Sequence, residues 1–119
     1  MSVAVACTTT STAFELQGVG QGVTLYGQIM LTHVPPVTTR DEAKIVWRMT
    51  GSGPLRLSTV GPGGVVGKLA WGPEAHGGSN YDRPGDEWGA GYRFPAAGCW
   101  RLHAERTVGS ADAWLLVTR

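Results

Sequence analysis

Apolar and polar residues alternate along several short stretches of the chain, which is the pattern of β-strands that bury one face. The stretch "CWRLHAER", residues 99–106, has the cleanest alternation. Its apolar side carries Trp100, Leu102 and Ala104, and its other side carries Cys99, Arg101, His103 and Glu105. Because a tryptophan and a leucine share the first side, we expect that side to face the core.

Seven segments are rich in β-branched and aromatic residues and are bounded by Gly, Pro, Ser or Asp. They are residues 23–31, 43–49, 55–60, 65–71, 87–94, 99–106 and 113–117. Turn-like sequences such as "TGSGP", "GPGG" and "PAAG" separate them, and no segment has a credible helical pattern. The chain is therefore predicted to be all-β, an antiparallel β-sandwich of about seven to eight strands. Residues 18–119 would form this single domain, and residues 1–17 an N-terminal segment or tether, or the first strand.

The segment "FPAAGCWRL", residues 94–102, has a glycine just before an aromatic residue at the start of the penultimate strand. In many immunoglobulin-like sandwiches an aromatic residue near the start of that strand pins the preceding loop. Trp100 would occupy this corner, and its buried indole N–H would need a backbone acceptor. We therefore expect Trp100 to have a structural role.

The amino-acid composition agrees with short strands and argues against some classes of function. The 119 residues include 18 glycines and 7 prolines, which interrupt long helices. Ten basic and nine acidic residues are spread along the chain, so no electrostatic footprint for nucleic acid or an anionic membrane is present. No apolar run reaches the roughly 18 to 20 residues needed to span a bilayer. We expect neither a nucleic-acid partner nor a transmembrane span.

The N-terminal stretch "MSVAVACTTTSTAF" has small and apolar residues leading into Cys7 and a polar run after it. It lacks the basic start of a complete signal peptide, but it is similar to the end of a bacterial lipoprotein signal, so a lipid anchor at Cys7 is one hypothesis. Alternatively, "SVAVA" is the first strand. A third hypothesis concerns the cysteine itself: two cysteines, an even number, in a tryptophan-rich sandwich with an export-like start suggest one disulfide between Cys7 and Cys99. Disulfide and lipid anchor exclude each other.

Cys99 and His103 have the spacing of ligands in blue-copper proteins, which are also β-sandwiches. However, no methionine follows His103, and no second ligand loop is apparent around His33 or His76. "His-Ala-Glu" at residues 103–105 matches the start of the zinc-deaminase signature, yet the required Pro-Cys-x-x-Cys is missing. Phosphate-binding loops and nucleophile elbows are also missing. We expect no metal, no cofactor and no enzyme activity, and we expect His103 to be a solvated surface residue.

The sequence predicts a long loop from residue 71 to residue 92, and loops of this length often bind a ligand or a partner. Aromatic rings beside acids and an arginine are typical of a carbohydrate or small-ligand site. The candidate ligand-binding residues are Trp71, Tyr81, Asp82, Arg83 and Trp88. In the alternative interpretation, the tryptophans fold the loop back onto the sandwich and Arg83 pairs with a neighbouring carboxylate.

From about residue 40 onward the sequence resembles small, mostly uncharacterised bacterial envelope proteins, often predicted lipoproteins. The resemblance lies in "KIVWRMTGSGPLRL", "WGPEAHGGS" and "RPGDEWGAGYRFPAAGCWRLHAERTVGSADAWLLV", which contains a Phe-Pro-x-x-Gly-Cys-Trp strand. It implies an immunoglobulin-like fold, an envelope location and a second cysteine near the N-terminus, and it implies no catalytic residue.

These observations lead to two hypotheses about function. The first is a non-enzymatic, extracytoplasmic accessory or interaction domain at the bacterial cell envelope, with protein partners and a place in a larger assembly. The alternative is a small carbohydrate- or ligand-binding module that uses the 71–92 loop.

Overall fold

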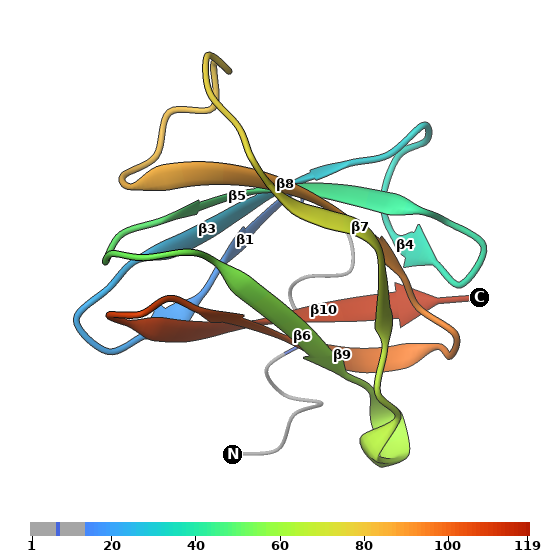
Figure 1. Cartoon of the computed structure of the whole chain (residues 1–119). Coiled ribbons are helices and arrows are strands. Elements are labelled where there is room, and N and C mark those ends of the chain that lie inside the picture. Colours follow the sequence, from blue (N-terminus) through green and yellow to red (C-terminus); the bar gives the residue numbers. More distant parts are fainter. Residues whose placement is uncertain (1–6, 8–13) are drawn as a thin grey trace.

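The structure is a computed structural model that describes Cys7 and residues 14–119, and these form two β-sheets packed as a sandwich (Figure 1). The first sheet, sheet A, has the strand order β1-β3-β5-β8-β7. The second, sheet B, has the order β2-β10-β9-β6, and β4 pairs with β10. All pairings are antiparallel except that between β4 and β10.

The strands have the following bounds: β1 Glu15–Gln17, β2 Val19–Gly20, β3 Leu25–Met30, β4 Val37–Thr38, β5 Ala43–Met49, β6 Arg56–Val60, β7 Lys68–Ala75, β8 Asp86–Arg93, β9 Gly98–Glu105 and β10 Ser110–Thr118. A short 3-10 turn, η1, covers Pro62–Gly64. Each of the seven predicted segments overlaps one of the strands β3 and β5 to β10, with the largest differences at β7, which runs four residues beyond its segment, and at β10, which begins three residues earlier. The three additional strands are only two or three residues long, which is too short for an alternating pattern to be recognised in a sequence.

The core lies between the sheets and is built from the inward side of each strand. Trp100, Leu102 and Ala104 are at most 1% exposed, so the predicted core side of β9 is confirmed. Tyr92 and Phe94 stack with ring centroids 5.8 Å apart, and Phe94 contacts Trp100 at 5.3 Å. The indole N–H of Trp100 donates to the backbone oxygen of Ala96 at 2.8 Å. This bond joins the start of β9 to the loop before it.

The predicted loop from residue 71 to residue 92 is shorter in the structure. Strand β7 runs to Ala75 and strand β8 begins at Asp86, so the connection contains only residues 76–85. Register shifts between Leu69 and Trp71 and between Trp71 and Glu74 break the alternation of β7. Its sequence also contains Gly72 and Pro73, which are uncommon inside strands, and this is why the pattern indicated a loop.

Cys7 and Cys99 form a disulfide with their Cα atoms 5.8 Å apart, so the predicted pairing is present. Cys99 lies on the outward side of β9, and Cys7 is 1% exposed. A sulfur in a disulfide cannot carry a lipid, so the structure favours the disulfide over the lipid anchor. The alternative first strand "SVAVA" and most of the predicted tether lie outside the described residues. Along the described part of the chain, no helix is long and apolar enough to cross a membrane.

Candidate functional site

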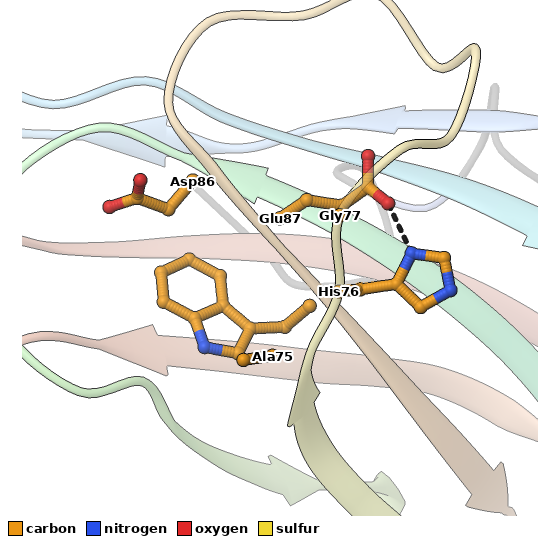
Figure 2. A pocket seen from close by; sticks show the side chains of 6 residues that line it. Ala75, His76, Gly77, Asp86 and Glu87 are labelled. Carbon is orange, nitrogen blue, oxygen red and sulfur yellow. Dashed lines mark hydrogen bonds and ion pairs between the residues drawn. The ribbon is translucent and has the colours of Figure 1, made fainter.

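The first candidate site lies on the outer side of sheet A, where loop 76–85 meets β8. Glu87 points outward from β8 opposite Arg48 of β5, yet its side chain is only 2% exposed. Ser79 donates its hydroxyl to Glu87 Oε1 at 2.5 Å, and His76 Nδ1 is hydrogen-bonded to Glu87 Oε2 (Figure 2). Arg48 Nε lies 3.1 Å from Glu87 Oε1, without the alignment of a hydrogen bond. The carboxylate therefore has two hydrogen bonds and an ion pair with the Arg48 guanidinium.

These contacts determine the charge of Glu87. Burial raises the pKa of this carboxyl, but the hydrogen bonds from Ser79 and His76 and the positive charge of Arg48 outweigh it, so the pKa lies below its ordinary value. Glu87 is thus ionised at neutral pH. An ionised carboxylate only accepts hydrogen bonds, so His76 Nδ1 carries the proton of that bond.

A hollow of about 410 Å³ lies beside this cluster, lined by Ala75, His76, Gly77, Asp86, Glu87 and Trp88 (Figure 2). His76 Nε2 has no hydrogen-bond partner in the part of the chain that the structure describes. A histidine oriented by a carboxylate in this way could act as a general base or a metal ligand. However, the Ser79 hydroxyl bonds to Glu87 rather than to His76 Nε2. Among residue 7 and residues 14–119, no group of three metal-ligating side chains is present.

The rest of the loop is attached to the opposite edge of sheet A. Arg83 makes two hydrogen bonds to the carboxylate of Glu15 in β1, at 2.9 and 2.8 Å. The Tyr81 hydroxyl donates to the same carboxylate at 2.7 Å, and Arg83 lies 5.0 Å from the centroid of the Tyr26 ring. The hydrogen bond from Arg83 lowers the pKa of Glu15, although burial opposes this. Burial and the Glu15 contact raise the pKa of Tyr81. The loop is thereby fastened to β1 and β3 as well as to β8.

The five predicted ligand-binding residues do not converge on one surface. Trp88 points inward, is 8% exposed, and has the Arg106 guanidinium 4.7 Å from its ring centroid. Tyr81 is 8% exposed, and Arg83 is paired with Glu15. Trp71 is half-buried and lies on the outer side of sheet A, against Gly91. Asp82 is exposed. The loop therefore folds back onto the sandwich, as in the alternative interpretation, but through Tyr81 and Arg83 rather than through tryptophans, and the carboxylate that pairs with Arg83 belongs to the distant Glu15.

The second candidate site lies on the outer side of sheet B. Arg101 Nε and His103 Nδ1 both bond to Asp112 Oδ1, at 2.8 and 2.7 Å. His103 Nε2 lies 3.2 Å from Glu105, which also pairs with Arg56 at 2.7 Å. Burial lowers the pKa of His103, but the bonds to Asp112 and Glu105 outweigh it and raise the pKa above its ordinary value. His103 therefore lies on the outer surface of the sheet, as expected, but as part of a charged network that the sequence did not indicate.

Two hollows adjoin this network. One of about 200 Å³ is lined by Ser58, Val60, Arg101 and His103. The other, of about 600 Å³, is lined by residues 60–63 around η1, residues 97–99 at the start of β9, and Arg101. Because both share Val60 and Arg101, they form one groove along the outer side of β6 and β9. We call this surface the β6–β9 groove. Its larger part is mainly apolar and contains Cys99 of the disulfide.

Sequence reasoning missed the partners Glu15, Arg48 and Asp112. Glu15 is 68 positions from Arg83, and Arg48 is 39 positions from Glu87 (87 − 48). Contacts between residues so far apart depend on the strand order, and no local sequence pattern predicts them.

No protein-family model matches the chain, and the searches of curated proteins and of solved structures also found no match.

Proposed function

We propose that this chain is an immunoglobulin-like domain of the bacterial cell envelope that binds another protein outside the cytoplasm and catalyses no reaction. The observation that carries the proposal is the Cys7–Cys99 disulfide, because disulfides persist in oxidising, extracytoplasmic compartments. The resemblance of residues 40–119 to bacterial envelope proteins supports the same location.

The strand order supports the immunoglobulin-like class. Strands β3, β5, β8 and β7 lie side by side in sheet A, and β6, β9 and β10 lie side by side in sheet B. Labelled A to G in chain order, these seven strands have the ABED and CFG order of constant-type immunoglobulin domains. The Trp100 bond to Ala96 lies at the corresponding corner, between the fifth and sixth of these strands.

The side chains support binding to a protein over the alternative hypothesis. Tyr81 and Trp88 are each 8% exposed, so they offer no face on which a sugar could stack. Ser79, Glu87 and Arg83 are occupied by intramolecular bonds. By contrast, Val60, Val65 and Val66 are 43%, 41% and 72% exposed beside the β6–β9 groove. Exposed aliphatic side chains next to an apolar groove are typical of a protein contact.

The location is tested by fractionating cells of the source organism and labelling thiols before and after reduction. We expect the chain in the envelope fraction, with no thiol reactive before reduction and two after it, because both cysteines are in the disulfide. A cytosolic chain with two reactive thiols in the cell would contradict the proposal.

The binding role is tested with a photo-crosslinking residue in place of Val66, and with the same residue at Val34 as a control. The two side chains are similarly exposed, at 72% and 75%, but Val34 lies in the connection between β3 and β4. We expect a protein adduct in cells from position 66 and none from position 34. Equal labelling, or no adduct at position 66, would contradict a protein contact there.

A further inference from the structure

The larger hollow of the β6–β9 groove exists because two turns made of small residues face each other. One turn comprises residues 61–63 around the start of η1, and the other is Ala97 with Gly98, the first residue of β9. A Cβ atom added at Gly98 would lie 2.4 Å from Pro62 Cγ, so the two turns are in close contact there. Among the described residues, none that lines the hollow is aromatic, and Val60, Pro62 and Ala97 give it aliphatic walls. Its volume of about 600 Å³ is within the range of small-molecule sites, roughly 300 to 1,000 Å³.

The backbone of β6 beside this hollow is already paired. Strand β9 lies on one side of β6, and on the other side Val60 forms a bridge with Val66. Gly67 N also donates to Thr59 O at 3.1 Å on that side. An extended protein segment would therefore find no strand edge to pair with at this point. An occupant of the hollow is held by apolar contacts and by side chains, which a small molecule can use as well as a protein can.

The charges along the groove leave one positive charge unmatched. Both ring nitrogens of His103 lie against carboxylates, Asp112 at 2.7 Å and Glu105 at 3.2 Å, so a protonated His103 donates to both. Together with Arg56 and Arg101, the network then has three positive groups and two negative ones. Arg101 uses only its Nε, and within the described chain its two terminal nitrogens have no partner. A carboxylate carries one negative charge and accepts two parallel bonds from a guanidinium, so it matches this free end.

We infer that the β6–β9 groove binds a small amphiphile with an alkyl chain and a single carboxylate. The chain lies in the larger hollow, against Val60 and η1, and the carboxylate pairs with the terminal nitrogens of Arg101, which lines both hollows. Val65 and Val66 are not among the described residues that line either hollow. This site is therefore separate from the protein contact proposed above, and it goes beyond the proposed function.

The test is a titration of the full-length, oxidised protein with octanoate, followed by amide chemical shifts. We expect shifts at Gly61, Gly98 and Arg101 and none in β3 of sheet A. Octanoate is expected to bind about tenfold more tightly than hexanoate, because two further CH₂ groups enter the hollow. Octanol has the chain without the charge, and acetate has the charge without the chain. Each of them is expected to bind more weakly than octanoate by about tenfold or more.

Matched variants locate the two parts of the site. Arg101→Gln is expected to weaken octanoate binding by about tenfold and to leave octanol binding unchanged, because it removes the charge and not the hollow. Val60→Thr keeps the shape of the side chain but puts a hydroxyl into the apolar wall, so we expect it to weaken binding of both probes several-fold. Arg93→Gln serves as the control, because Arg93 is also an exposed arginine in an ion pair, with Glu42, but lies on sheet A.

The inference would be overturned by equal binding of octanoate and acetate, by octanoate binding that Arg101→Gln leaves unchanged, or by the absence of shifts in the groove. A short blocked peptide of threonines with one leucine and one aspartate is titrated in parallel. If the peptide shifts the groove amides and octanoate does not, the groove binds a protein segment and the inference is also overturned. The proposed function is tested separately, by the location of the chain and by the crosslink from position 66.

Discussion

At the residue scale, Trp100 and Trp114 lie on opposite sides of sheet B and differ in whether the indole N–H donates a hydrogen bond. Trp100 donates to Ala96 O at 2.8 Å, whereas Trp114 Nε1 is buried without a hydrogen-bond partner among the described residues. A buried donor without a partner lowers stability, and a satisfied one contributes about 1 kcal/mol. The sequence predicted the need of Trp100 for an acceptor, because its alternation placed the ring in the core. Nothing in the local sequence predicted that the indole N–H of Trp114 would be buried without a hydrogen bond.

This difference predicts effects of unequal size for the same substitution at the two positions. Trp100→Phe removes the bond to Ala96 and part of a core ring, so we expect the free energy of unfolding to fall by about 1 to 3 kcal/mol. Trp114→Phe removes a donor that has no partner, and we expect a change of less than about 1 kcal/mol. Urea denaturation of both variants measures this. Equal losses would contradict the importance of the Ala96 bond.

A second prediction at this scale concerns the contact between Trp71 and β8. A Cβ atom added at Gly91 would lie 2.2 Å from Trp71 Nε1, whereas one added at Gly89 would have its nearest atom, also of Trp71, at 3.5 Å. Gly91→Ala must therefore displace the indole, and we expect a loss of about 1 to 3 kcal/mol together with greater quenching of tryptophan fluorescence by acrylamide.

Gly89→Ala is the matched control on the same strand, and we expect it to fold with little change in stability. Neither glycine has a positive φ, so both accept alanine without backbone strain. Unchanged stability and quenching in Gly91→Ala would contradict close packing of the Trp71 indole against Gly91.

At the element scale, loop 76–85 is held by side chains at both ends rather than by its own backbone. His76 and Ser79 bond to Glu87 on β8, and Tyr81 and Arg83 bond to Glu15 on β1. The loop therefore crosses the outer side of sheet A, whose strand order places β1 and β8 on opposite sides of β3 and β5. The sequence predicted a loop rich in polar and aromatic residues here. It did not predict the contact with Glu15, or on which side of the sheet each aromatic ring lies.

Glu15→Gln tests this attachment. Loss of the charge weakens the two bonds from Arg83, so we expect amide hydrogen exchange of residues 80–84 to become several-fold faster. Because the pair is partly exposed, we expect global stability to change by less than about 1 kcal/mol. Glu42→Gln is the control, because Glu42 pairs with the exposed Arg93 away from the loop. Unchanged exchange in the loop after Glu15→Gln would contradict the attachment.

At the scale of the whole molecule, the disulfide closes most of the chain into one loop. It joins residues separated by 92 positions, and in the entropic model such a closure stabilises the folded state by on the order of 4 kcal/mol. We expect reduction to lower the urea midpoint accordingly. The chain has two cysteines, so the double variant with serine at both positions should behave like the reduced protein. A midpoint that does not move on reduction would contradict this prediction.

His33 and His103 both contact carboxylates, and these contacts predict how stability depends on pH. The pKa of His33 is raised by its bond to Asp41, and that of His103 is raised by Asp112 and Glu105 despite burial. Their contribution is complete below 6.5, the ordinary histidine value, and is lost as the pH rises through the raised values. The pKa values of Glu15 and Glu87 are lowered, so their contribution is present above 4.5 and is lost as the pH falls through the lowered values.

We therefore expect maximal stability between the ordinary values of 4.5 and 6.5, and a decline toward pH 8. Urea denaturation across this range measures it. The variant with both His33→Gln and His103→Gln should lose most of the decline between about pH 6 and pH 8. A decline of the same size in this variant would show that other groups cause it.

The sequence by itself determined the all-β class, the seven longer strands, the core side of β9 and the cysteine pair. These features follow from side-chain alternation and from residue types, which act locally along the chain. Only the tertiary structure decided that Glu15 meets Arg83, that Trp71 and Trp88 lie on opposite sides of one sheet, and that β6 and β9 enclose a groove. Those contacts join residues far apart in sequence, and the strand order and register that bring them together are set by packing of the whole sandwich.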